Sequence, residues 1–424
     1  MRRAGGIVLT REKQVFLARR GGRAPFLPGF HVFPGGAIEP QDQGSTLACA
    51  VRELYEETGI RLPPGELQPA GLMVTPDYSL LRFEAQFYLA ECPTGQTPQM
   101  LTEELVEGDW YEPAAALQAW EEGHLLLAPP TLASLRAFAA HGFEEGARQL
   151  QALGPSNGLP GLAIPMAPGL AYLPLVSPTL PPARHTLTYV VGGDRLLVVD
   201  PGSPEVEPIV AHLKSLEPAR PLEVVLTHHH PDHIQGATRL GLPVAAHPET
   251  ARRLPFAVDR LIEEGERWQL GRGWNLEALH TPGHAPGHMA LWQPERRFLL
   301  AGDLVSSIST IVIEPGEGDM AAYFDSLERV RALEPRLVLP AHGPPLGPGS
   351  DPFGHLLAHR RKREAKVLAS LTQTPQSLEQ ILSVVYDDKP GVETIARLAL
   401  ESHLEKLLRE GLVVAIDGGW TISS

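Results

Sequence analysis

The chain has 424 residues, 43% of them hydrophobic and 20% charged, with a formal net charge of −14 and only two cysteines. This length provides for two or three globular domains, and the negative charge disfavours broad nucleic-acid binding, which depends on a positive surface. The sequence shows no signal peptide, no apolar run near the ~20 residues of a membrane span, and too few cysteines for a disulfide framework. We therefore expect a protein of the reducing cytoplasm with no membrane segment.

The first chemical feature is a carboxylate-rich segment over residues 47–58, where apolar residues recur at helical spacing and Gly59 is placed to end the helix. Glu53, Glu56 and Glu57 fall on one face of this helix. Carboxylates this close repel one another unless a divalent cation lies between them, and oxygen ligands suit magnesium or manganese. The alternative interpretation is an ordinary solvated face.

This helix and the glycines before it resemble the Nudix box, Gly-x5-Glu-x7-Arg-Glu-x2-Glu-Glu-x-Gly, with Arg52 ahead of the first helical carboxylate. The first half of the motif departs from the family pattern. Two extra residues separate Gly36 from Arg52, and Gly44 stands where the box has its first Glu. Asp42 and Glu39 are both candidates to replace that carboxylate.

The resemblance covers about residues 5–141 and implies a Nudix α/β/α sandwich that cleaves a diphosphate. It is similar to the branch that contains the peroxisomal coenzyme A diphosphatases, which favours coenzyme A or its esters as substrate. The resemblance assigns Glu53, Glu56 and Glu57 to a Mg²⁺ or Mn²⁺ ion, with Glu53 and Glu56 also catalytic, and Arg52 to orienting a carboxylate. Acidic candidates to complete the site from a later loop are Glu103, Glu104 and Glu107.

A helical pattern followed by a Gly- and Pro-rich stretch predicts where this first domain ends. Residues 132–153 have apolar positions at helical spacing and are expected to form its closing helix. Residues 154–161 are rich in Gly and Pro and do not favour regular structure. We therefore expect a first domain over residues 1–150 and a linker over residues 151–169.

Four histidines and an aspartate crowd into residues 228–233, directly after a short apolar run that predicts a buried strand. Imidazole and carboxylate groups are the ligands that zinc prefers. Because alternate residues of an extended segment point the same way, His228 and His230 can share one metal ion. Asp232 and His233 then turn towards a second. A chance surface cluster is the alternative.

Three more candidate ligands stand where short apolar strands end at Gly/Pro-rich turns: His284, Asp303 and His342. Strand ends that border turns place polar groups on a common rim of a sheet. Together with residues 228–233 they resemble the metallo-β-lactamase superfamily, over residues 170–357. The resemblance implies an αβ/βα sandwich with two metal ions, usually Zn²⁺, with Mn²⁺ or Fe²⁺ as alternatives.

The resemblance also carries over the ligand roles. It assigns His228, His230 and His284 to one metal ion, Asp232, His233 and His342 to the other, and Asp303 as the bridge, with Asp232 also catalytic. His229 and His288 have no assured ligand role, and we expect them to be structural. Two such metal ions would lower the pKa of a bridging water and supply hydroxide for attack on a carbonyl or phosphoryl centre.

Residues 358–424 are expected to form helices followed by a hairpin, a winged-helix-like tail similar to that of the beta-lactamase-like endoribonuclease subgroup. Residues 359–363 contain a local basic cluster. The tail either reads nucleic acid or covers the edge of the zinc domain, and the acidic residues of its last helix favour the structural role.

The complete fold class predicted is α/β and α+β multidomain, and the function is a bifunctional metal-dependent hydrolase. A zinc half of the glyoxalase II type would cleave a thioester of the metabolite class that the Nudix half takes, so both partners are small molecules, of diphosphate or thioester type. Two alternatives stay open. One is an RNA-processing enzyme with a zinc-dependent endoribonuclease half, and the other has one half as a non-catalytic ligand sensor.

Overall fold

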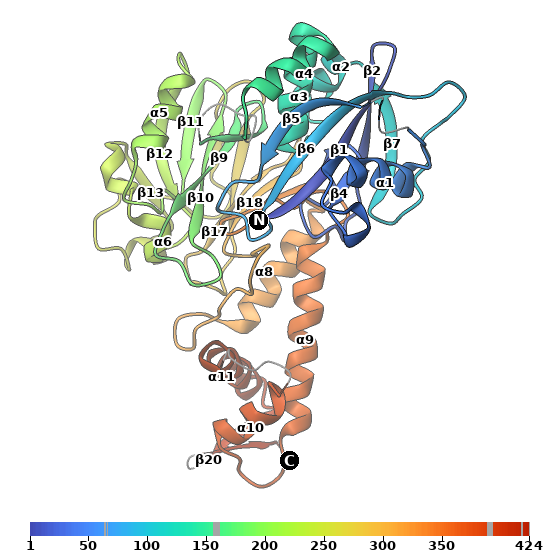
Figure 1. Cartoon of the computed structure of the whole chain (residues 1–424). Coiled ribbons are helices and arrows are strands. Elements are labelled where there is room, and N and C mark those ends of the chain that lie inside the picture. Colours follow the sequence, from blue (N-terminus) through green and yellow to red (C-terminus); the bar gives the residue numbers. More distant parts are fainter. Residues whose placement is uncertain (63–64, 66, 156–161, 388–392, 417–418, 424) are drawn as a thin grey trace.

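The structure is a computed structural model that describes residues 1–62, 65, 67–155, 162–387, 393–416 and 419–423. Figure 1 shows two α/β bodies packed side by side and a narrower C-terminal tail that projects from them. The predicted multidomain α/β architecture is confirmed. Within the described residues, we find no helix of the length and apolar character that crossing a membrane requires.

The first body is built on a seven-stranded sheet in the order β3-β2-β1-β6-β5, with β4 paired to β1 and β7 paired to β2. The central pair, β1 and β6, is parallel, and β1 with β2 is antiparallel. The strands are β1 (Arg2–Arg11), β2 (Gln14–Arg20), β3 (His31–Val32), β4 (Gly35–Ala37), β5 (Gln68–Val74), β6 (Phe83–Glu91) and β7 (Leu105–Tyr111).

Helices cover both faces of this sheet, because β1 alternates its side chains between two apolar clusters. Ile7 and Leu9 pack with Leu54 of α1 (Thr46–Thr58), whereas Val8 packs on the other face with Leu135 of α3 (Pro129–His141). Among the described residues of this body, further helices are α2 (Pro113–Glu121), α4 (Phe143–Ala152) and the short 3-10 helix Pro40–Asp42. The result is the expected α/β/α sandwich.

Two helix ends bear on the sequence predictions. Helix α1 ends as predicted at Gly59, whose φ of 74° is the left-handed conformation that glycine favours. The single closing helix expected over residues 132–153 is wrong. Gly142, with φ 77°, interrupts it and separates α3 from α4.

The second body is formed by two sheets. One has the order β14-β13-β12-β11-β10-β9-β8 and the other the order β15-β16-β17-β18-β19. Their strands are β8 (Ile164–Ala167), β9 (Leu170–Val176), β10 (His185–Gly192), β11 (Arg195–Val199), β12 (Arg220–Leu226), β13 (Val244–Ala246), β14 (Arg260–Leu261), β15 (Arg267–Gln269), β16 (Asn275–His280), β17 (Met289–Gln293), β18 (Phe298–Gly302) and β19 (Leu337–Pro340).

The two sheets face each other across one apolar cluster, to which Val191, Val225, Leu291 and Leu300 contribute. Each sheet carries its helix on the outer side: Val224 packs with Ile209, and Leu299 packs with Leu327. This is the predicted αβ/βα arrangement. The helices of this body are α5 (Glu207–Ser215), α6 (Pro231–Ile234), α7 (Pro248–Ala251), α8 (Met320–Ala332) and the 3-10 helix Ala237–Leu240.

Part of the segment expected as a linker belongs to the second body. Of the residues 151–169 expected as linker, 156–161 lie outside the described residues, and β8 pairs with β9 in the second sheet. The bodies also share their core. Trp120 of α2 donates from Nε1 to the Met166 carbonyl at 3.0 Å, and the hydroxyls of Tyr78 and Tyr172 lie 2.5 Å apart across the junction.

The tail consists of α9 (Pro352–Ser370), α10 (Leu378–Val385), α11 (Glu393–Arg409) and a hairpin of β20 (Val413–Ile416) and β21 (Gly419–Ile422). Helices and hairpin therefore lie where the sequence placed them, although 417–418 of the expected turn lie outside the described residues. The winged-helix interpretation stays a prediction.

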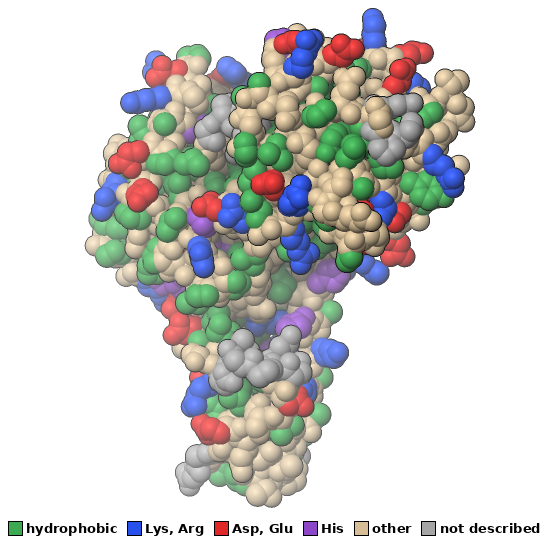
Figure 2. All heavy atoms as spheres, viewed as in Figure 1, with side chains coloured by type: hydrophobic (Ala, Val, Ile, Leu, Met, Phe, Trp, Pro, Cys, Tyr) green, Lys and Arg blue, Asp and Glu red, His purple; other side chains and the backbone are tan. Residues whose placement is uncertain are grey.

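The basic cluster of residues 359–363 is largely engaged in contacts with the rest of the chain. Arg360 is buried and donates to the Ile311 carbonyl, Arg361 pairs with Glu328, and Arg363 donates to the Val385 carbonyl. On the face that Figure 2 shows, basic and acidic side chains are interspersed over the tail. These contacts favour the structural role over phosphate binding.

Candidate functional sites

The seven predicted metal ligands of the second body converge at one rim of its two sheets. Residues 228–233 follow β12, and Pro231 starts the short helix α6, which turns the chain so that the later ligands face inward. The other three stand in the loops after β16, β18 and β19, and they are His284, Asp303 and His342.

The first ligand group consists of three imidazoles. Nε2 of His228 and Nε2 of His284 each lie 3.0 Å from Nδ1 of His230. Burial lowers the pKa of His228 well below its usual value and that of His284 to about 4. Buried imidazoles are thereby kept neutral, which is the form that binds a metal ion.

The second group adds carboxylates. Nε2 of His342 lies 3.3 Å from Oδ2 of Asp232 and 3.4 Å from Oδ1 of Asp303, while Nε2 of His233 lies 3.6 Å from Oδ1 of Asp303. The other oxygen of Asp303 lies 3.5 Å from Nε2 of His284 in the first group. Asp303 therefore stands between the two groups, where a bridging ligand belongs.

Two buried atoms in this cluster test whether metal ions fit. Nε2 of His233 and Oδ1 of Asp303 are buried without a hydrogen-bond partner among the described residues. Burial opposes charge on His342, yet Asp303 and Asp232 raise its pKa to about 10. The two carboxylates therefore favour a cation at this position. A bound cation would also satisfy the two buried atoms that have no hydrogen-bond partner. The residues fit two metal ions.

The far nitrogens of the ligand imidazoles are also held. Nδ1 of His284 lies 2.7 Å from the Val312 carbonyl, and Nδ1 of His342 lies 3.1 Å from the His185 carbonyl. Because a carbonyl only accepts, both Nδ1 atoms must donate. This fixes the tautomer that leaves Nε2 free for a metal ion.

Asp200 is a functional residue that sequence reasoning missed. It follows β11, is 2% exposed, and accepts from the Thr227 amide and hydroxyl at 2.8 and 2.7 Å. Its Oδ2 also lies 2.9 Å from Nδ1 of His233. Asp200 therefore orients His233 and fixes the residue before His228. Its place directly after an apolar strand is the one signal that the sequence offered.

Glu317 is a second residue that the sequence analysis did not single out. Its Oε1 lies 2.9 Å from Nε2 of His230 and 3.1 Å from Nε2 of His229. Hydrogen bonds from these two histidines hold the pKa of Glu317 well below its usual value. His229 thus contacts the carboxylate that orients His230.

His288 has the structural position expected of it. Its Nε2 accepts from the Asp303 amide at 3.0 Å, and its Nδ1 lies 2.8 Å from the Thr281 hydroxyl. Gly302, with φ 51°, lies so close that a Cβ would stand 2.6 Å from Nε2 of His288. The turn that presents Asp303 is therefore fixed by its neighbours.

In the first body, Arg52 holds the carboxylates of the Nudix-like segment. It donates to both oxygens of Asp42 at 2.9 Å and to Glu53 and Glu56 at 2.9 Å each. Asp42 is 3% exposed, whereas Glu39 is exposed. Between the two candidates for the missing box carboxylate, the structure therefore gives Asp42 the buried partnership with Arg52.

The three helical carboxylates are not equivalent. Glu57 is 4% exposed and accepts from the Gly35 amide at 2.9 Å, and burial raises its pKa to about 8. Burial also raises the pKa of Glu53, whereas the Glu56 side chain is 49% exposed. Among the described residues, the compact ligand groups all lie in the second body, so these carboxylates are more widely spaced than the histidine cluster.

Of the later acidic candidates, Glu104 lies nearest to this group. It contributes to the raised pKa of both Glu53 and Glu57, and it accepts from Arg20 at 2.7 Å. Glu107 is paired instead with Arg19.

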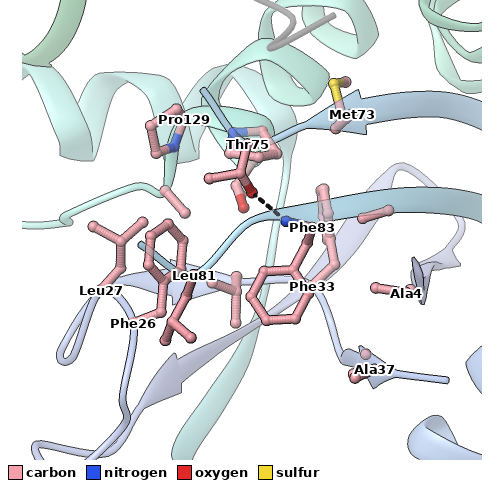
Figure 3. A pocket seen from close by; sticks show the side chains of 18 of the residues that line it. Ala4, Phe26, Leu27, Phe33, Ala37, Met73, Thr75, Leu81, Phe83 and Pro129 are labelled. Carbon is pink, nitrogen blue, oxygen red and sulfur yellow. Dashed lines mark hydrogen bonds between the residues drawn. The ribbon is translucent and has the colours of Figure 1, made fainter. Parts of the chain in front are cut away.

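Glu53 and Glu104 line a cavity of about 380 Å³. Figure 3 shows apolar side chains of its wall, among them Met73 of β5, Phe83 of β6 and Phe26 of the loop before β3. Two residues of the second body, Ile164 and Tyr172, complete the lining. The cavity therefore combines candidate magnesium ligands with an apolar lining that both bodies provide.

Comparison with known proteins agrees with the family predicted for each half of the chain. Residues 1–128 match the NUDIX domain and residues 181–342 match the Metallo-beta-lactamase superfamily. A Beta-lactamase-like protein 2 homolog from Caenorhabditis elegans is 28% identical over 246 residues, which cover 54% of this chain and 81% of that protein. An atrochrysone carboxyl ACP thioesterase from Paecilomyces divaricatus is 28% identical over 54% of this chain and 74% of its own.

Among solved structures, a beta-lactamase domain protein from Burkholderia ambifaria superposes with a TM-score of 0.54 at 22% identity, over 62% of this chain and 95% of that one. This likeness shows the fold. The fold and the two family matches define a hydrolase with a candidate metal site. More particularly, the chain contains a NUDIX domain and a metallo-β-lactamase superfamily domain, both of hydrolase families.

Proposed function

We propose that the chain is a bifunctional hydrolase whose metallo-β-lactamase domain cleaves a thioester or ester with two bound metal ions. The observation that carries this proposal is the convergence of seven ligands around two buried atoms that lack hydrogen-bond partners, Nε2 of His233 and Oδ1 of Asp303. The name of the thioesterase relative supports a thioester as the substrate.

Two metal ions in such a site supply Lewis acidity and acidify a water molecule. The roles of the protein groups follow from the geometry. Burial opposes ionisation of Asp232, yet His233 and His342 lower its pKa to about 2, so the carboxylate is ionised at neutral pH. Since Asp232 is also partly exposed, it is placed to accept the proton of the attacking water. Addition of this water to the thioester carbonyl gives a tetrahedral intermediate. Its collapse breaks the C–S bond, and the proton held by Asp232 passes to sulfur, so that a thiol, a carboxylate and a proton are released.

The NUDIX domain is proposed to cleave a diphosphate, with coenzyme A or its esters as the favoured substrate and Mg²⁺ or Mn²⁺ as the ion. Glu53, Glu56 and Glu57 are the proposed ligands, and Glu104 joins them from the loop before β7. The salt bridge between Arg52 and Asp42 supports the ligand helix, because it holds Arg52 against the neighbouring carboxylates.

The proposal is tested with purified full-length protein and two substrates, a coenzyme A thioester and a diphosphate. Elemental analysis should find about two equivalents of zinc, manganese or iron. Asp232→Ala should lower the metal content and abolish thioester cleavage, while Glu56→Gln should cut diphosphate cleavage by roughly two orders of magnitude. Less than one metal equivalent in supplemented protein contradicts the first function.

The sensor alternative has one observation in its favour, the wider spacing of the NUDIX carboxylates. It predicts that the domain binds a diphosphate without cleaving it at millimolar magnesium or manganese. Release of product from any diphosphate substrate, lost in Glu56→Gln, excludes it.

A further inference from the structure

The cavity beside Glu53 bears on the chemistry of the group attached to the diphosphate. Its wall is built largely from hydrocarbon side chains, among them Phe26, Phe33, Leu81 and Phe83 (Figure 3). Its volume, about 380 Å³, lies within the range of small-molecule sites. A diphosphate held at Glu53 would therefore direct its neighbouring group against an apolar surface.

In addition to the candidate metal ligands, the lining of the cavity includes Arg2, Arg20, Glu39 and Thr131. Two polar side chains of the apolar wall are already engaged. Oγ1 of Thr75 accepts from the Phe83 amide at 3.1 Å, as Figure 3 shows, and the Tyr78 hydroxyl is paired with that of Tyr172. Recognition of a nucleobase requires donors and acceptors that match its edge, and an unmatched polar edge in an apolar cavity is costly. The lining is better suited to a hydrocarbon group.

We propose that this cavity binds a hydrocarbon chain attached to the diphosphate of the substrate. The proposal rests on the diphosphatase function proposed above. The second domain takes part, since Ile164 and Tyr172 close the wall. Substrate selection by the NUDIX domain thus depends on an intact junction between the domains.

The test compares geranyl diphosphate with isopentenyl diphosphate, which carry the same charged group and differ by five carbons. Binding to the full-length protein is measured by calorimetry with magnesium present, and phosphate release is followed in the same samples. Geranyl diphosphate should bind at least about tenfold more tightly, since burial of two methylene groups already corresponds to that ratio.

Leu81→Arg places a charge in the cavity and should abolish the difference between the two ligands. Leu80→Arg is the matched control, because Leu80 is the preceding residue and is 52% exposed. Equal affinities in the wild type, tighter binding of ADP-ribose than of geranyl diphosphate, or equal effects of the two variants would overturn the proposal. A chain-length preference in protein that releases phosphate from neither ligand and product from no coenzyme A substrate would refute the diphosphatase function and leave the cavity proposal standing.

An independent set of contacts concerns the tail. The loop between β18 and α8 supplies two contacts to the metal ligands, from the Val312 carbonyl to His284 and from Glu317 to His230. The tail holds this loop on either side of those contacts. Arg360 of α9 donates to the Ile311 carbonyl, Ser402 of α11 donates to the Ile313 carbonyl at 2.5 Å, and Arg409 pairs with Asp319.

We infer that the tail positions the ligands of the first metal ion through this loop. Helices α9 and α11 of the tail are tied together by the half-buried Glu364, which accepts from Lys406 at 2.8 Å and lies 3.1 Å from Nδ1 of His403. The tail thereby supports the loop segment that carries Val312 and Glu317, and Ser402 and Arg409 are positioning residues that touch no substrate.

The readout is release of the two metal ions to a chelator, followed over time in the full chain. Ser402→Ala and Arg409→Ala should each speed release of one ion by about tenfold, the scale of contacts behind metal ligands, and leave the other unchanged. Ser383→Ala is the control, because its hydroxyl donates to the Gln380 carbonyl within α10. Release as in the wild type from both variants, or equal acceleration of both ions, would overturn the inference.

Discussion

Replacing Asp200 by asparagine should weaken binding of the second metal ion without creating a cavity in the core. The carboxylate accepts from the Thr227 amide and hydroxyl and faces Nδ1 of His233. Asparagine keeps the shape, and its single oxygen can keep the bond from the amide. Its NH₂ group then faces His233, where a donor meets a donor. The imidazole relieves this by moving its proton to Nε2, the atom that the metal ion requires.

The size of the expected loss in metal affinity follows from the lost hydrogen bond between Asp200 and His233. A hydrogen bond to a charged group contributes about 1.5–3 kcal/mol, which corresponds to a factor of roughly 10–150, and contacts behind metal ligands typically change affinity by about 10–100-fold. We therefore expect Asp200→Asn to raise one of the two metal dissociation constants by about 10–100-fold, measured by competition with a chromophoric chelator. Asp194→Asn is the control, since that carboxylate pairs with Arg272 on the surface. Unchanged affinity in Asp200→Asn would refute the role assigned to this residue.

Three further predictions concern single residues. Burial raises the pKa of Glu57 to about 8, so in metal-free protein the free energy of unfolding should fall as pH rises from about 4.5 to 8, and Glu57→Gln should flatten that dependence in urea titrations. Gly302→Ala should destabilise the protein by at least ~1 kcal/mol, because φ is 51° and the added Cβ meets His288; a normal melting temperature would contradict this. Burial raises the pKa of Cys49 to about 11, so iodoacetamide should leave it unmodified at pH 8 until the chain unfolds, as mass spectrometry would show.

Much of the fold could be predicted because its signals are local. Helical spacing placed α1, and apolar runs placed the strands that precede the candidate metal ligands of the second domain; Gly59 marked the end of α1 as expected. The error at Gly142 has a local cause too. A helical apolar pattern continues through residues 132–153, since the two helices pack on the same core, so periodicity alone did not reveal the break.

The residues of the candidate site also divide into those that the sequence predicted and those that it did not. The convergence of the candidate metal ligands was predictable, because metal binding restricts the residue types and the strand ends restrict their positions. Asp200 and Glu317 were not, because a carboxylate that supports a ligand carries no spacing of its own. Asp200 is 33 positions from His233, and Glu317 is 87 from His230; only the fold brings each pair together. Asp42 was left undecided against Glu39 for the same reason, until burial separated them.

The junction between the domains leads to the last prediction. A Gly/Pro-rich linker suggests separable units, yet one apolar cluster includes Trp120 of the first domain and Tyr172 of the second, at 4% and 1% exposure. A fragment of residues 1–155 would expose Trp120 and lose its bond to the Met166 carbonyl. Full exposure of a large apolar side chain costs about 1.5–3 kcal/mol. The fragment should therefore unfold at clearly lower urea concentration than the NUDIX domain within the full chain, followed by hydrogen exchange. Equal stability would mean that the junction is only a tether, and the dependence of the cavity on both domains would fail with it.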